Sequence, residues 1–85
     1  MLAPTDDALM AAYAAGDASA FAPLYERHHA ALYRFIRRLL GTALAAQTGG
    51  VFQDTWLRVV QARGRRAPQG AGFRTWLYTL GHHRV

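Results

Sequence analysis

The feature of this sequence that most restricts its fold is the spacing of its apolar residues, which recur every three or four positions. The longest such pattern lies between Asp17 and Gly41, and its repeat matches the period of an α-helix with one buried face. Alanine-rich runs add to this preference because alanine loses the least entropy in a helix. We therefore predict an all-α fold, a compact bundle of about four helices.

Capping residues define a first short helix. Thr5 is a candidate N-cap, and Asp6 and Asp7 complement the positive end of the helix that follows. The helix is predicted to run to Ala15 and to stop at Gly16.

The second predicted helix is the longest, with Asp17 as its cap and Gly41 at its end. Pro23 lies inside this pattern and deletes a backbone hydrogen bond, so the helix either kinks there or begins its regular part at the proline. The predicted buried face consists of Phe21, Leu24, Tyr25, His28, Leu32, Phe35, Ile36, Leu39 and Leu40.

Two further helical patterns occupy the second half of the chain. The third helix is predicted to start at or just before Val51, because Gly49 and Gly50 are poor helix formers, and Thr48 is its candidate cap. The fourth helix opens near Phe73. The predicted core faces of these two helices are Phe52, Trp56, Val59 and Val60 in the third, and Phe73, Trp76, Leu77 and Leu80 in the fourth.

Length and charge restrict the class of protein. A chain of 85 residues has room for one small domain, so we predict a single domain over residues 1–85. The formal net charge is +5, and every basic residue is arginine, which predicts a polyanionic partner without separating nucleic acid from a membrane surface or an acidic protein. The absence of cysteine, of a signal peptide and of a membrane-spanning run predicts a soluble, cytoplasmic protein.

Catalysis is poorly supported by the sequence. The acidic residues are few and none forms an obvious pair with a base, while Glu26 and His29 have the spacing of a helical metal motif that would be needed twice in a di-metal bundle. We predict that the protein is not an enzyme and has no cofactor.

A basic loop and the helix after it are the strongest candidates for a binding surface. The loop combines arginine, glutamine and glycine, and the following helix offers an arginine, a tyrosine and two histidines off its apolar face. Such a surface can neutralise phosphates and stack exposed bases, and Tyr78 is its best exposed stacking candidate. Trp56, Phe73 and Trp76 are interpreted as core residues instead. The candidate DNA-binding residues are Arg63, Arg65, Arg66, Gln69, Arg74, Tyr78, His82, His83 and Arg84.

The segments VFQDTWLRV and FRTWLYTL, together with Gly16-Asp17 and Ala20-Phe21, resemble the second conserved region of a bacterial sigma factor of the extracytoplasmic-function group. The resemblance covers the chain from about Asp6 to Val85. It implies a helical bundle that docks on a coiled coil of the largest RNA polymerase subunit and captures the non-template strand of the minus-ten promoter element. It also implies that the polymerase-binding residues of the third helix are Gln53, Asp54, Leu57 and Arg58, and that the loop from Arg65 to Gly72 and the exposed face of the fourth helix form the promoter-melting surface.

The chain departs from the family pattern at three places. Gly49 and Gly50 stand where relatives usually carry an acidic pair, and Gly81-His82-His83 replaces a usual Ala-Arg-Asn. The C-terminal helix-turn-helix domain is absent, so we expect a fragment of a longer protein. The first departure motivates an alternative hypothesis: a helical interaction module that binds an anti-sigma factor and has little affinity for DNA.

Overall fold

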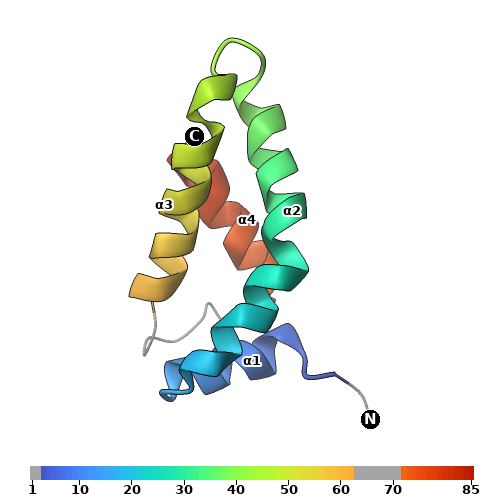
Figure 1. Ribbon diagram of the computed structural model, residues 1–85, viewed down its shortest axis with the longest axis vertical. Helices are drawn as coiled ribbons and strands as arrows, with labels where there is room; N and C mark the ends of the chain where they lie inside the picture. The colour runs from blue at the N-terminus through green and yellow to red at the C-terminus, as the bar shows by residue number, and fades with distance from the viewer. Residues whose placement is uncertain (1–2, 63–71) are drawn as a thin grey trace.

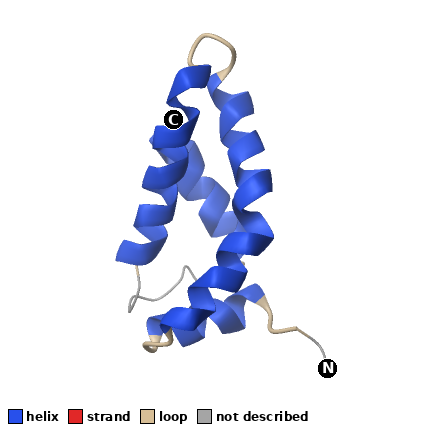
Figure 2. Ribbon diagram, in the orientation of Figure 1, coloured by secondary structure: helices blue, strands red, loops and turns tan. Residues whose placement is uncertain are grey.

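The computed structural model describes residues 3–62 and 72–85, and in these two ranges all the regular structure is helical (Figure 2). The all-α prediction is therefore confirmed, as is the number of main helices. None of the described helices has the length and apolar character needed to cross a bilayer. The helices are α1 (Asp6–Ala14), η1 (Ala18–Ala20), α2 (Phe21–Leu40), η2 (Ala45–Gln47), α3 (Thr48–Gln61) and α4 (Phe73–Arg84).

The long helices α2 and α3 form a pair, α4 packs against both of them, and α1 lies across one end of the bundle (Figure 1). Helices α2 and α4 each contact all three of the other main helices. Helix α2 is the longest and contributes the most completely buried side chains. Its Leu24, Leu32 and Ile36 are completely buried, together with Val59 of α3 and Leu77 of α4. Burial of one such side chain contributes about 1.5–3 kcal/mol, so this line of residues holds the helices together.

The predicted boundaries of the N-terminal helices are close to the observed ones. The Thr5 hydroxyl accepts a hydrogen bond from the Ala8 amide at 3.1 Å, as an N-cap does, and Gly16 ends this segment with a φ of 113°. Asp17 caps the short helix η1 rather than α2 itself. Helix α2 begins two residues before Pro23, which therefore lies in the first turn, where backbone amides have no partner within the helix.

The predicted start of the third helix is wrong. Helix α3 begins at Thr48, so Gly49 and Gly50 belong to its first turn. Thr48 is almost fully buried, and its hydroxyl donates to the Ala45 carbonyl at 2.7 Å instead of capping the helix. The short helix η2 leads directly into α3, and burial of Thr48 offsets the entropic cost of the two glycines, which is about 0.5–1 kcal/mol each.

Two predicted core residues lie outside the core. Leu39 is 38% exposed and Val60 is 41% exposed. Thr55 is completely buried in their place, and its hydroxyl donates to the Val51 carbonyl at 2.8 Å. Successive side chains along a helix point about 100° apart, so Val60 points away from the core that buries Val59. Thr55 can be buried because its hydroxyl donates to the carbonyl one turn earlier in the helix.

Candidate functional site

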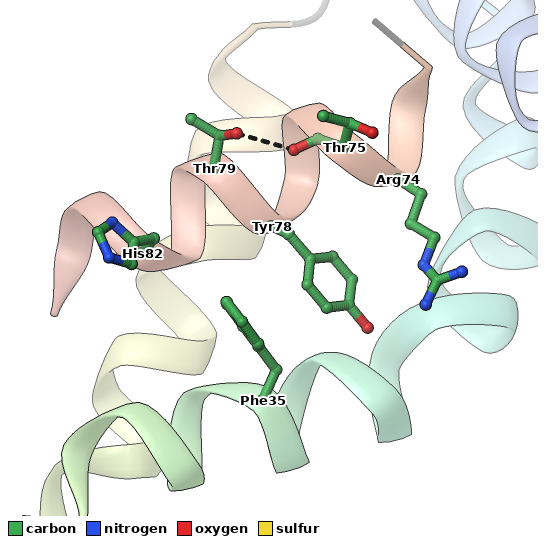
Figure 3. Close-up of a pocket in the computed structure, with 6 residues that line it drawn as sticks. All are labelled: Phe35, Arg74, Thr75, Tyr78, Thr79 and His82. Carbon is green, nitrogen blue, oxygen red and sulfur yellow. Dashed lines mark hydrogen bonds between the residues drawn. The ribbon is translucent and has the colours of Figure 1, made fainter.

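A pocket of about 520 Å³ lies between α2 and α4 (Figure 3). The Tyr78 ring packs against the Phe35 ring with 4.7 Å between centroids, which forms an aromatic wall. The Arg74 guanidinium carbon lies 5.5 Å from the centre of the Tyr78 ring, within the range of a cation–π interaction. Thr75, Thr79 and His82 complete the described lining.

The chemistry of this pocket suits a ligand that is both planar and anionic. The aromatic wall offers a surface for stacking, and Arg74 offers a planar cation with several hydrogen-bond donors. The Thr79 hydroxyl already donates to the Thr75 carbonyl at 2.9 Å, so it has only acceptor capacity left for a ligand. Arg74 and His82 are exposed, which leaves their polar atoms accessible.

Tyr78 differs from its predicted state. It was expected to be the best exposed stacking residue, but it is half-buried, because α4 crosses α2 beside Phe35 and the two rings pack together. His83 and Arg84 are exposed at the end of α4, as expected for residues off the apolar face. Four predicted DNA-binding residues lie outside the described residues: Arg63, Arg65, Arg66 and Gln69.

A second hollow, of about 580 Å³, lies between α2 and α3. Leu57 is 53% exposed at its surface, beside the exposed Val60 and Tyr33. Gln53 and Leu57, both predicted to bind polymerase, are part of its lining. We call this hollow the α2–α3 groove; its described lining residues are Tyr25, Tyr33, Gly49, Phe52, Gln53, Trp56, Leu57 and Val60, and none of them is charged.

Asp54 and Arg58, the other two predicted polymerase-binding residues, lie on the outer face of α3. The Asp54 carboxylate accepts a hydrogen bond from Arg84 at 3.3 Å, so the structure joins one residue of each predicted set. Both side chains are more than a third exposed, and an exposed ion pair of this kind contributes at most about 1 kcal/mol to stability.

A junction between α1, α2 and α4 was not predicted from the sequence. The Asp6 carboxylate accepts from Arg27 at 3.0 Å and lies 2.7 Å from Nε2 of His28, both on α2. Asp7, the next residue, accepts a hydrogen bond from the Phe73 amide at the start of α4, at 3.1 Å. Burial raises the pKa of Asp6, but the hydrogen bonds and charges of Arg27 and His28 outweigh this effect and leave the pKa below its ordinary value.

The core interpretation of the large aromatic residues holds for Trp56 and Phe73, which are 6% and 2% exposed. Trp76 is half-buried and packs against the same core. The candidate metal residue His29 stacks on Tyr25 with 4.9 Å between ring centroids. Within residues 3–62 and 72–85, no three acidic, histidine or cysteine side chains gather in a way that could hold a metal ion.

Comparison with known proteins decides the family. Residues 24–85 match the family described as Sigma-70 region 2. The chain belongs to this family. The region 2 domain is similar to the ECF RNA polymerase sigma factor BldN of Streptomyces coelicolor, with 32% identity over 71 residues. It is equally similar to the ECF RNA polymerase sigma factor SigK of Mycobacterium sp. strain KMS, with 32% identity over 79 residues.

These relatives identify the chain as a region 2 domain of the extracytoplasmic-function group, part of a transcription initiation factor. The aligned segments cover 84% and 93% of this chain but only 26% and 40% of BldN and SigK. No solved structure matches the chain significantly. Membership of a sigma factor family is consistent with the prediction that the protein is not an enzyme. Every described residue of the α2–α4 pocket lies within the matched range, whereas α1 precedes it.

Proposed function

We propose that this domain docks on core RNA polymerase through the α2–α3 groove and the outer face of α3, and holds the single-stranded non-template strand of the minus-ten promoter element against α4. The observation that carries the proposal is the placement of Arg74 beside the Tyr78 and Phe35 rings in the α2–α4 pocket. Membership of the sigma factor family supports the choice of both partners. Both act in the cytoplasm, where we place this domain.

The DNA side of the proposal rests on what an unpaired nucleotide offers. Its base has an apolar face and its phosphate a negative charge, and the pocket presents aromatic rings next to a guanidinium. Stacking of a base on an aromatic side chain contributes about 1–3 kcal/mol. His83 and Arg84 extend the surface along α4 beyond the pocket. The domain would use this binding energy to stabilise the open duplex, without covalent chemistry.

The polymerase side rests on the character of the α2–α3 groove. Exposed Leu57, Val60 and Tyr33 surround it, and aromatic rings form much of its lining. Protein interfaces have such an apolar centre with a polar rim. Arg58, exposed on the same helix, and Asp54 supply charged groups at the edge. This arrangement suits a helical protein partner better than a nucleic acid strand.

The experiment that tests the proposal compares one labelled minus-ten oligonucleotide as a single strand and as a duplex. We expect the domain to bind the non-template single strand more tightly than the duplex, and the affinity to fall as salt is raised, because arginine side chains displace counterions from phosphates. Fluorescence anisotropy provides the measurement, with a single strand of scrambled sequence as the control. Equal affinity for all three oligonucleotides, or affinity that ignores salt, would show that the DNA assignment is wrong.

A further inference from the structure

The residue at the cap position of helix α4 cannot cap it with a side chain. Gly72 occupies the cap position and has no side chain to accept a hydrogen bond from the first amides of the helix. The Asp7 carboxylate takes this role from a distance of 66 positions along the sequence, by accepting from the Phe73 amide. A carboxylate at this end of a helix is also favoured by the helix dipole. The first turn of α4 is therefore held by α1.

Helix α1 is itself fixed in place. Asp6 and Asp7 are adjacent, so their side chains diverge by about 100° around the helix, and Asp6 reaches α2 while Asp7 reaches α4. Leu9, Met10 and Tyr13 bury the other side of α1 in the core. The acceptor at the start of α4 is thus carried by an element that is anchored to α2.

The residues that line the α4 side of the α2–α4 pocket come directly after Phe73 in the sequence. Arg74 is the next residue after Phe73, and Tyr78 lies on the same side of α4, with Arg74 near its ring. The pocket exists only if α4 keeps its position relative to Phe35 of α2. We infer that Asp7 is a positioning residue for the DNA-binding surface: it ties the first turn of α4 to α1 and so determines where Arg74 and Tyr78 lie. This role rests on the proposed function.

The test separates the charge of Asp7 from its hydrogen bond. Asp7→Asn and Asp7→Ala both remove a negative charge, which by itself raises affinity for DNA, but only asparagine keeps an oxygen that can accept from the Phe73 amide. We expect Asp7→Ala to bind the single-stranded minus-ten oligonucleotide roughly threefold to tenfold more weakly than Asp7→Asn, the usual scale of a lost cap. Hydrogen exchange measured by NMR should show faster exchange of the Phe73 amide in Asp7→Ala alone.

A second variant separates positioning from simple helix stabilisation. Gly72 has the extended backbone of a cap residue, and no atom of the described residues lies within 4 Å of a Cβ added there, so Gly72→Ser can cap α4 locally. In the Asp7→Ala background we expect Gly72→Ser to restore the helix signal and the melting temperature, but not the affinity for DNA, because the tie to α1 is still missing. Gly72→Ser alone should bind as the wild type does.

Asp17→Ala is the matched control. It removes the same charge and a local cap, since Asp17 accepts from the Ser19 amide at 3.1 Å, and its described contacts do not involve α4. Equal binding by Asp7→Ala and Asp7→Asn, or full recovery of affinity by Gly72→Ser, would overturn the positioning role while the wild type still binds. A wild type that does not bind the oligonucleotide would overturn the proposed function, and the positioning role with it.

Discussion

The two hollows on either side of α2 differ in their chemistry. The α2–α4 pocket has Arg74 and His82 beside an aromatic wall, whereas the described lining of the α2–α3 groove contains only uncharged residues. Their volumes are similar, about 520 and 580 Å³, so size does not distinguish them. The difference shows that one small bundle can present a cationic hollow and an apolar hollow on two faces of the same helix. The first two of the following predictions each affect one hollow and spare the other, and the last two concern the stability of the helices that form them.

The largest effect is expected at the α2–α3 groove. Leu57→Asp places a charge at the centre of this apolar surface, and we expect association with core polymerase to weaken tenfold or more, the scale of a central interface residue. Affinity for single-stranded minus-ten DNA should stay unchanged. Binding to immobilised core enzyme measures the first quantity, and circular dichroism checks that the helices persist.

Leu44→Asp is the matched control for this substitution. Leu44 is 45% exposed, close to the 53% of Leu57, but lies in the connection between α2 and η2, outside the groove. It should leave polymerase binding intact. If Leu44→Asp and Leu57→Asp weaken binding equally, or neither does, the groove is not the docking surface. If a pull-down with the wild-type domain then recovers no core polymerase, the alternative hypothesis of a helical interaction module is favoured.

The next effect is expected in the α2–α4 pocket. Arg74→Ala removes a guanidinium next to Tyr78, and we expect single-strand affinity to fall about threefold to tenfold. The slope of the logarithm of affinity against the logarithm of salt concentration should decrease by about one, as for the loss of one phosphate contact. Arg58→Ala removes the same charge from α3 and serves as the control. Salt titrations of both variants measure the difference. Identical slopes for Arg74→Ala and the wild type would remove Arg74 from the DNA surface.

A smaller effect concerns the stability of α4. Gly81 is buried where α4 meets α2, and a Cβ atom added there would lie 3.4 Å from Cδ1 of Leu32, an ordinary contact distance. Gly81→Ala should therefore stabilise the domain by about 0.5–1 kcal/mol through helix propensity. Urea unfolding measures this change, with Gly50→Ala in open space on α3 as the control. A loss of stability in Gly81→Ala alone would mean that α2 and α4 cannot accommodate the methyl group.

The smallest effect is a pH dependence. The pKa of Asp6 is lower in the folded chain than its ordinary value, so its contribution to stability is present above about pH 4 and is lost as the pH falls through the folded pKa. Asp6→Asn should be slightly less stable than the wild type near neutrality and should approach it in acid. Melting temperatures measured from about pH 7 to about pH 3 give the two curves. Curves that stay parallel would contradict the assignment.

Much of the fold follows from local patterns. The helical spacing of apolar residues records burial, and it correctly predicted the faces that contain Leu24, Leu32 and Leu77. The prediction failed at Leu39 and Val60, which lie at the edge of the apolar pattern. The angle between two helices decides whether such a residue is buried, and the pattern carries no information about that angle.

Less of the candidate site than of the fold could be predicted from the sequence. The low helix propensity of glycine predicted that α3 begins after Gly49 and Gly50, but the burial of Thr48 outweighs this propensity and both glycines belong to the helix. Tyr78 was expected to be exposed because it lies off the apolar face of its helix, whereas its packing against Phe35 depends on where α4 crosses α2. The hydrogen bond from Phe73 to Asp7 joins residues 66 positions apart, so only the folded chain reveals it. Features that depend on contacts between distant segments could not be predicted, whereas the type of each main helix and most of its buried face could.

The most direct test of this account asks whether the two sides of α2 can be occupied at once. A labelled single-stranded minus-ten oligonucleotide is bound to the domain, core polymerase is added, and anisotropy is followed, with Leu57→Asp and polymerase alone as controls. We predict a further rise that requires Leu57, because a ternary complex forms. Release of the oligonucleotide by polymerase would show that both partners compete for one surface, and would contradict the account.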